Sequence, residues 1–260
     1  MVTNATARSV AGSLLVLLLV ACSRQEPAVP PATATPGDPV AAAVADATRP
    51  AAARVQDSFR RPSEILAFSR VKPGDFVIEI GPGAGYYTAL LSRVVGPAGR
   101  VLAIDSEKLF EFMPRARESF AAYSAADPRD NVEYRPQHLD ALELPEGANQ
   151  VWIVQFYHDT VYLGDDRAAM NRAIFERLSP GGVYLVIDHH AGEGTGTAAA
   201  RDLHRVDAAL VRAEVEAAGF VLESQSDALA HPEDPRSDSV FDEQRRGRTD
   251  QFVFRFVKPR

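Results

Sequence analysis

The sequence predicts an α/β domain built on a mostly parallel, doubly wound sheet. Three observations favour this fold class: short runs rich in Val and Ile alternate with stretches of helical length, a glycine-rich turn directly follows the first run, and an acidic residue lies at the end of each of the first two runs. Strands that alternate with helices in this way form a parallel sheet covered on both faces. Ligands of such sheets bind at the carboxyl ends of the strands.

The first strand, turn and helix are the most informative part of the chain. Residues 77–80 (Val-Ile-Glu-Ile) have the β-branched density of a buried parallel strand, and residues 87–94 are typical of the helix that follows. Between them, residues 81–85 carry three glycines, which let the backbone approach a ligand closely. A dinucleotide-binding loop needs a further glycine where this chain has Tyr86, which argues against an oxidoreductase.

The second strand, residues 100–104, ends in Asp105. A carboxylate at this position can accept hydrogen bonds from both hydroxyls of a ribose. The glycine turn alone is a weak signal, because ordinary strand-to-helix turns share it. Together with Glu79 and Asp105, it predicts a site for a nucleoside-containing cofactor.

The remaining elements continue the alternation toward the C-terminus. Their limits follow from hydrophobic periodicity and from glycine and proline stops. The sequence predicts strands over residues 150–156, 183–187, 220–224 and 250–257, helices over residues 168–178 and 206–218, and a turn over residues 179–182 that ends the first of these helices.

These features resemble motif I and its companion position in the class I S-adenosylmethionine (SAM) methyltransferases. The resemblance rests on Glu79, Gly81, Gly83, Gly85 and Asp105. It implies that SAM is the cofactor. It also implies that Glu79 faces the positively charged amine of the amino-acid tail of SAM and that Asp105 holds the ribose.

The resemblance covers residues 58–257 and implies a Rossmann-like sheet of seven strands, the last antiparallel, with helices on both faces. The acidic residue that related enzymes place near the adenine amine corresponds to Asp140, for which a solvated loop aspartate is the alternative. Several segments are also similar to one group of predicted bacterial methyltransferases with a lipoprotein signal peptide: residues 61–64, 82–87, 157–159, 188–189, 203–207 and 247–252.

Polar residues follow the fourth and fifth strands. In the enzymes that the chain resembles, the end of the fourth strand faces the reactive methyl group. Methyl transfer is an in-line displacement in which the acceptor loses a proton, and an imidazole can take that proton. We therefore expect His158 to be the general base, with His189 as the second candidate. A histidine that only satisfies a loop carbonyl is the alternative for either residue.

A metal site built from Asp159, Asp188, His189 and His204 is a further alternative. The spacing of these residues matches no compact ligand pattern, such as two histidines four residues apart on a helix. We therefore expect no metal centre.

The N-terminus has the features of an exported lipoprotein. Arg8 precedes an apolar run at residues 10–20, which is too short to span a bilayer comfortably, and a lipobox-like Leu-Val-Ala-Cys ends at Cys22. Cys22 is the only cysteine among the 260 residues, as suits an oxidising compartment. We expect residues 1–22 to be a lipoprotein signal peptide and Cys22 to carry lipid; a buried N-terminal helix is the alternative.

The expected location is the cell envelope, lipid-anchored and facing the periplasm, with Ser23 favouring the outer membrane; the protein is cytoplasmic if the signal is not used. Residues 23–53 are rich in Ala and Pro and are expected to form a disordered tether, followed by one methyltransferase-like domain over residues 54–260. A net charge of −7 argues against a nucleic-acid substrate.

Two functions stay open at this point. The first is a SAM-dependent methyltransferase that acts on an unidentified small-molecule or envelope-associated acceptor. An exported enzyme of this kind would need SAM outside the cytosol, where SAM is made. The second is a non-catalytic envelope lipoprotein that binds a nucleoside-like or other small ligand on the same scaffold. The intact glycine turn with Glu79 and Asp105 favours the enzyme.

Overall fold

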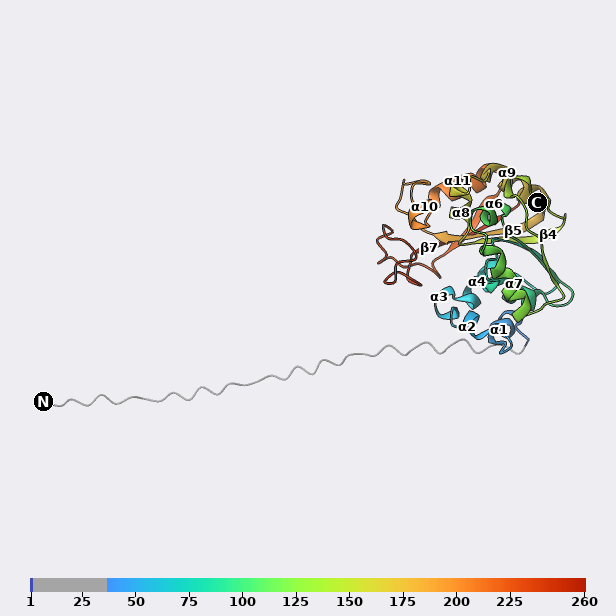
Figure 1. Cartoon of the computed structure of the whole chain (residues 1–260), viewed down its shortest axis with the longest axis horizontal. Helices are drawn as coiled ribbons and strands as arrows, with labels where there is room; N and C mark the ends of the chain where they lie inside the picture. The colour runs from blue at the N-terminus through green and yellow to red at the C-terminus, as the bar shows by residue number, and fades with distance from the viewer. Residues whose placement is uncertain (2–36) are drawn as a thin grey trace. The chain divides into compact units, whose positions relative to one another are not determined.

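The protein is represented by a computed structural model that describes Met1 and residues 37–260 (Figure 1). Beyond Met1, the expected signal peptide, Cys22, which is expected to carry lipid, and the first part of the expected tether lie outside the described residues. Among the residues that are described, no helix has the length and apolar character that a membrane span requires.

Seven strands form one sheet in the order β3-β2-β1-β4-β5-β7-β6. The pairs on the β3 side of β5 are parallel, whereas β7 runs antiparallel to both β5 and β6. This confirms the predicted seven-stranded, mostly parallel sheet with an antiparallel last strand. The strands are β1 Phe76–Ile80, β2 Arg100–Ile104, β3 Val132–Tyr134, β4 Ala148–Val154, β5 Leu178–His189, β6 Val221–Ser226 and β7 Gln251–Val257.

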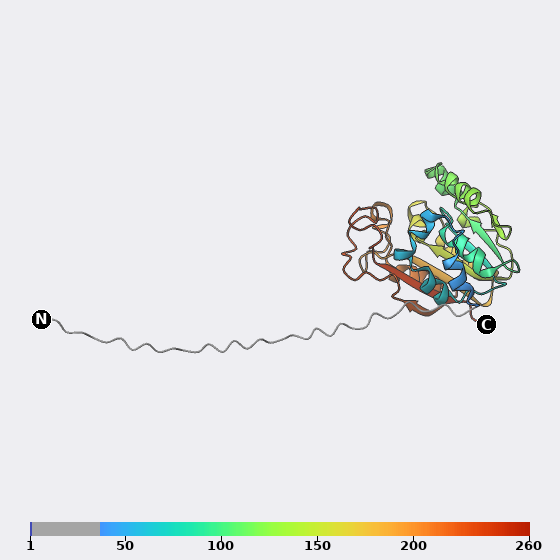
Figure 2. The same ribbon diagram turned by 90° about the horizontal axis from the view of Figure 1, so that it is seen from below.

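Helices cover both faces of the sheet. Helices α1 to α4 lie on one side of it, and α8 to α11 lie on the other (Figure 1). The turned view places the N-terminal helices, in blue, in front of the strands (Figure 2). The helices are α1 Pro39–Ala45, α2 Ala51–Arg54, α3 Asp57–Arg60, α4 Pro62–Ser69, α5 Tyr86–Val95, α6 Glu107–Phe112, α7 Ala116–Ala126, α8 Tyr157–Tyr162, α9 Arg167–Arg177, α10 Ala200–Leu203 and α11 Ala208–Ala217, with a 3₁₀ turn η1 at Leu139–Ala141.

The side chains of β1 alternate between the two faces of the sheet and pack in two different hydrophobic clusters. Val77 packs in the cluster that includes the apolar side chains of α4 and α5, whereas Ile78 and Ile80 pack in the cluster that includes those of α9 and α11. All five residues of β1 are buried. A strand covered on both faces needs a continuous apolar run, and this is the pattern by which the sequence predicts it.

Strands β1, β2 and β4 end level with one another. Ile80 pairs with Ile104 of β2 and with Ile153 of β4. The residues that follow these strands therefore meet at one edge of the sheet. The strand order also reverses between β1 and β4, which is where ligands of open parallel sheets bind.

Part of the expected tether is folded, so that the prediction for residues 23–53 extends too far. Asp38 caps α1 by accepting a hydrogen bond from the backbone N–H of Val40. Ala43 is 3% exposed, and the Arg49 guanidinium is buried in an ion pair with Asp57. This segment is poor in large apolar side chains, but its alanines pack against α4 and α5. Composition alone does not reveal this packing.

The predicted turn at residues 179–182 is part of an irregular strand start. Helix α9 ends at Arg177 and β5 begins at the next residue. Ala148 of β4 pairs with Leu178, and the register shifts before Gln150 pairs with Val183. Gly181 has φ +76°, a left-handed conformation that favours glycine.

Candidate functional site

A cleft of about 250 Å³ opens at the carboxyl ends of β1, β2 and β4. Its lining comes from Glu79, the glycine turn, Asp105 and residues 154–156, together with Arg60 of α3 and Gln56, which directly precedes α3. We call it the strand-end cleft. A larger hollow of about 510 Å³ beside α1 lies away from these strand ends.

The three glycines of the turn have positive φ values of +70°, +55° and +71°, but they are needed for different reasons. A Cβ on Gly81 would stand 2.3 Å from the ring of Phe156, and one on Gly85 would stand 2.3 Å from the ring of Tyr123. A Cβ on Gly83 would meet nothing within 4 Å, and this residue lines the strand-end cleft. Gly81 and Gly85 therefore serve packing, whereas Gly83 leaves open space for a ligand.

Glu79 lies on β1 and is only 3% exposed. The hydroxyl of Thr88 donates a hydrogen bond of 2.5 Å to its Oε2. Burial raises the pKa of Glu79 to about 7, and the bond from Thr88 only partly opposes this. A cationic partner in the cleft would stabilise the charged form of this carboxyl.

Asp105 follows β2 and is 2% exposed. The hydroxyl of Tyr134 donates a hydrogen bond of 2.8 Å to Oδ2. No described residue meets hydrogen-bond geometry at the buried Oδ1. Burial raises the pKa of Asp105 to about 6, against the opposing effects of the Tyr134 hydroxyl and the Gly83 N–H. A buried acceptor without a partner is costly, so Oδ1 marks a place where a ligand donor would bind.

Asp140 lies apart from the cleft lining. Its Oδ2 accepts a hydrogen bond of 2.8 Å from Nζ of Lys108, and this ammonium also lies 3.3 Å from Oδ1 of Asp165. The bond from Lys108 lowers the pKa of Asp140. The structure thus gives this aspartate a lysine partner and does not bring it together with Glu79 and Asp105.

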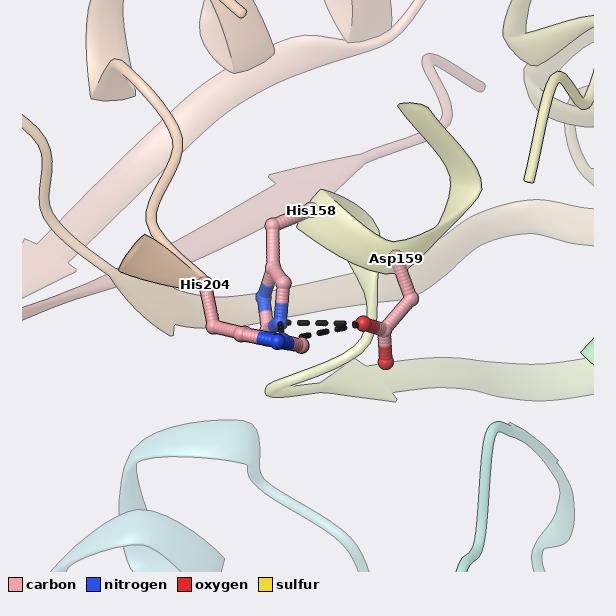
Figure 3. A group of neighbouring side chains, drawn as sticks. All are labelled: His158, Asp159 and His204. Carbon is pink, nitrogen blue, oxygen red and sulfur yellow. Dashed lines mark hydrogen bonds and ion pairs between the residues drawn. The ribbon is translucent and has the colours of Figure 1, made fainter. Parts of the chain in front are cut away.

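His158 is buried at the start of α8, after β4 has ended. Its Nδ1 lies 2.7 Å from Oδ1 of Asp188, and its Nε2 lies 3.1 Å from Oδ1 of Asp159. Because the strand has ended, His158 and Asp159 point toward the same place (Figure 3). Burial would lower the pKa of His158, but Asp188 and Asp159 outweigh it and raise the pKa to about 10.

His189, at the end of β5, is buried. Its Nδ1 lies 2.9 Å from Oγ1 of Thr249, and burial holds the pKa of His189 well below its usual value. Its ring centre lies 6.1 Å from that of His158. Neither histidine lines the strand-end cleft, whereas Asp159 does.

Three polar residues of the cleft lining, Gln56, Arg60 and Gln155, are not among the site residues that the sequence predicts. Gln155 follows β4 in a left-handed conformation with φ +54°, which is uncommon for a residue other than glycine. Arg60 of α3 lies 4.7 Å from the ring centre of Tyr86. Gln155 is a polar residue at a strand end, a signal that could have been used. Arg60 reaches the cleft only through the fold of the N-terminal helices.

One family model and several curated proteins match this chain in sequence. The family model described as Protein-L-isoaspartate(D-aspartate) O-methyltransferase (PCMT) matches residues 61–188, slightly less than half of the chain. Arsenite methyltransferase of Halobacterium salinarum is 30% identical over 122 residues, 47% of this chain and 29% of that protein. The Ubiquinone/menaquinone biosynthesis C-methyltransferase UbiE of Pasteurella multocida is 30% identical over 120 residues, 46% of this chain and 42% of that protein. The chain thus spans less than half the length of either relative.

Solved structures share the fold at low sequence identity. A SAM-dependent methyltransferase from Aquifex aeolicus matches with a TM-score of 0.54 and 16% identity, over 78% of this chain and 98% of that one. Fibrillarin from Aeropyrum pernix, with natively bound SAM, matches with a TM-score of 0.51 and 16% identity, over 78% of this chain and 76% of that one. The [4+2]-cyclase SpnF matches with a TM-score of 0.55 and 16% identity, over 80% of this chain and 81% of that one. These matches establish the Rossmann-like fold of SAM-dependent methyltransferases.

Proposed function

We propose that this protein is a SAM-dependent methyltransferase that acts on a small-molecule or envelope-associated acceptor. The family model, the curated relatives and the SAM-containing neighbour support this class of enzyme and this cofactor. Within the chain itself, one observation carries the proposal. The buried Oδ1 of Asp105 lacks a hydrogen-bond partner among the described residues, in a cleft where Gly83 leaves open space.

The residues of the strand-end cleft fit SAM by their chemistry. Asp105 would accept hydrogen bonds from the ribose hydroxyls, and Gly83 would let the cofactor approach the backbone. Glu79 would face the positively charged amine, which stabilises the charged form of a buried carboxyl. Bound SAM would supply an electrophilic methyl group.

Asp159 is our candidate for the residue that orients the acceptor, because it lines the cleft and lies beside the predicted base. Asp188 and Asp159 raise the pKa of His158, which favours its doubly protonated form with Nε2 donating to Asp159. The general-base role predicted for His158 therefore requires that the proton on Nε2 leaves first. His189 is farther from this role, since its Nδ1 is engaged by Thr249 and it does not line the cleft.

The proposal is tested by measuring conversion of SAM to S-adenosylhomocysteine. The full-length protein is supplied with SAM and, in separate reactions, with the small-molecule fraction and the envelope fraction of a bacterial extract. We expect protein-dependent product with one of these fractions, and no product with the folded Gly83→Val variant. Product that forms equally with the variant would contradict the assignment of this cleft.

A non-catalytic ligand-binding protein is the second candidate. The observation that favours it is the position of the His158 ring between the carboxylates of Asp159 and Asp188, which raise its pKa, since an imidazolium cannot accept a proton. The likeness to a [4+2]-cyclase also shows that the fold alone does not fix the chemistry. Tight binding of SAM without turnover in any fraction would favour this candidate.

The lipid anchor at Cys22 stays a separate proposal, motivated by the lipobox-like residues 19–22. We expect radiolabelled palmitate to be incorporated into the wild-type chain in bacterial cells and not into Cys22→Ser. Incorporation into both chains, or into neither, would contradict lipidation at Cys22. Either result leaves the cofactor proposal untouched, because that proposal rests on Glu79, Gly83 and Asp105 among the described residues that line the strand-end cleft.

A further inference from the structure

Three polar side chains to which the proposal assigns no contact with the cofactor converge on one point. They are His158 and Asp159 of α8 and His204, which directly follows α10 (Figure 3). Each offers one donor atom: Nε2 of His158, Oδ1 of Asp159 and Nδ1 of His204. Residues 158 and 204 are far apart in sequence, so this cluster exists only in the folded chain.

The distances between the three atoms suit a single metal ion. Nε2 of His158 lies 3.2 Å from Nδ1 of His204 and 3.1 Å from Oδ1 of Asp159, and the third distance is 3.5 Å. Ligand atoms about 2.1 Å from a tetrahedral metal ion lie about 3.4 Å from one another. The donor atoms are therefore already spaced as the ligands of one ion would be.

A further carboxylate orients the first histidine. Oδ1 of Asp188 lies 2.7 Å from Nδ1 of His158, and Oδ2 of Asp188 accepts a hydrogen bond from the backbone N–H of His158. Metal-binding histidines commonly donate their second ring N–H to a carboxylate in this way. This bond orients the ring so that Nε2 faces Asp159 and His204.

His204 is held in an unusual backbone conformation. Its φ is +54°, in the left-handed region that residues other than glycine rarely adopt. The ring of Phe241 packs edge-on against the imidazole at 4.7 Å between ring centres. Strained backbone of this kind is concentrated at functional sites, and here it directs Nδ1 of His204 toward the cluster.

We propose that His158, Asp159 and His204 bind a divalent transition-metal ion such as Zn²⁺ or Fe²⁺ at the rim of the strand-end cleft. Two histidines and one carboxylate are the protein ligands of many catalytic zinc sites and of non-haem iron sites. The metal ligands considered from the sequence are Asp159, Asp188, His189 and His204; the cluster shares Asp159 and His204 with that set and contains His158 in place of the other two. A bound metal ion would occupy Nε2 of His158, so this histidine would then not serve as the general base.

Three protein ligands leave at least one coordination position for another molecule. Asp159 also lines the strand-end cleft, and the side chain of His204 is 24% exposed, so the position can be reached. If the proposed methyltransferase function holds, on which this step alone rests, the position would take an oxygen, nitrogen or sulfur atom of the methyl acceptor.

The test is titration of the untagged full-length protein with Co²⁺ after treatment with a chelator. We expect one Co²⁺ per chain, with the visible absorption of a low-coordinate cobalt site, and displacement by Zn²⁺. Addition of azide should shift the cobalt bands if a position is open. Absence of Co²⁺ and Zn²⁺ binding to the wild-type protein would overturn the proposal.

Variants separate this cluster from adventitious metal binding. Asp188→Asn should weaken binding about 10- to 100-fold, as loss of an orienting carboxylate does. His204→Asn should weaken it more, and Asn tolerates the left-handed backbone there. The matched control is His231→Asn, because His231 is a partly exposed histidine paired with Glu233 outside the cluster. Equal affinity in His204→Asn and His231→Asn would overturn the proposal.

Two measurements keep the outcome clear. Thermal melting in chelator shows whether each variant is folded, and Asp159→Asn replaces His204→Asn if the latter is not. Titration with SAM in chelator tests the cofactor site without metal. Cobalt binding with no SAM binding would leave the metal site standing and overturn the proposed function, and the reverse result would do the opposite.

Discussion

The hydroxyl of Tyr134 donates a hydrogen bond to one oxygen of Asp105 and leaves the other oxygen without a described partner. Tyr134 lies at the end of β3, and its ring stacks on that of Phe120 with the ring centres 4.1 Å apart. The carboxylate is thereby fixed in orientation at the end of β2. This arrangement prepares Oδ1 for a ligand hydroxyl before any ligand binds.

Replacement of Tyr134 by Phe should weaken SAM binding about 3- to 10-fold, because Asp105 loses the bond that fixes it. The matched control is Tyr123→Phe. Tyr123 is a buried tyrosine next to the glycine turn, and its hydroxyl has no hydrogen-bond partner among the described residues. Calorimetry on both variants checks the prediction. A loss of affinity as large in Tyr123→Phe as in Tyr134→Phe would contradict it.

Gly83→Ala should weaken SAM binding at least about 10-fold, because the added methyl group would occupy space that the ligand needs. Its φ of +55° also makes the substitution strained, by about 1–2 kcal/mol. Gly147→Ala separates the two effects: Gly147 has φ +83° with nothing near its Cβ position and lies outside the cleft. We expect both variants to melt at a lower temperature than the wild type and only Gly83→Ala to lose affinity for SAM. Unchanged affinity in Gly83→Ala would place the cofactor elsewhere.

The ligand-free protein should lose stability as the pH rises from about 4.5 to about 7. The folded pKa of Glu79 is raised to about 7 by burial, so the folded state binds the proton that the unfolded state releases near pH 4.5. The contribution is present below pH 4.5 and lost as the pH rises through 7, by at most about 3 kcal/mol. Glu79→Gln should remove this share of the pH dependence.

Urea unfolding at pH 5 and pH 8 measures that difference for the wild type and the variant. Glu118→Gln, at an exposed position of α7, is the control and should behave as the wild type. SAM should reduce the effect, since its amine stabilises the charged carboxyl. The assignment would be wrong if Glu79→Gln had the same pH dependence as the wild type.

A chain that starts at residue 37 should melt at the same temperature as the full-length protein, whereas one that starts at residue 51 should melt about 5–10 °C lower. The second deletion removes α1 and Arg49, and it takes Asp46 away from the buried guanidinium of Arg93. Differential scanning calorimetry compares the two. Equal melting temperatures would restore the tether prediction for residues 37–50.

The strands that are covered by helices on both faces are predictable from the sequence. The predicted strand over residues 100–104 coincides with β2, because a strand covered on both faces needs an apolar run that is visible in the sequence. Helix α1 is not predictable in this way, because its alanines are stabilised by surfaces of α4 and α5. Composition then favours a tether where the fold contains a helix.

The candidate cofactor site is largely local in sequence, and the structure brings Glu79, Gly83 and Asp105 to one cleft. The polar residues beyond β4 and β5 are different. The contact between His158 and His204 spans 46 positions and depends on how α10 packs against α8. The partner of Asp140 is equally hidden, because Lys108 lies 32 residues earlier in the chain. The spacing of residues in the sequence cannot predict these contacts.

The most direct test of the cofactor site is calorimetric titration of the full-length protein with SAM and with S-adenosylhomocysteine. We predict micromolar, one-to-one binding of both, weakened at least about 10-fold by Asp105→Asn, which removes one of the two acceptor oxygens while keeping the side-chain shape. A folded protein that binds neither molecule, or an Asp105→Asn variant that binds them as tightly as the wild type, would contradict the cofactor site described for the strand-end cleft.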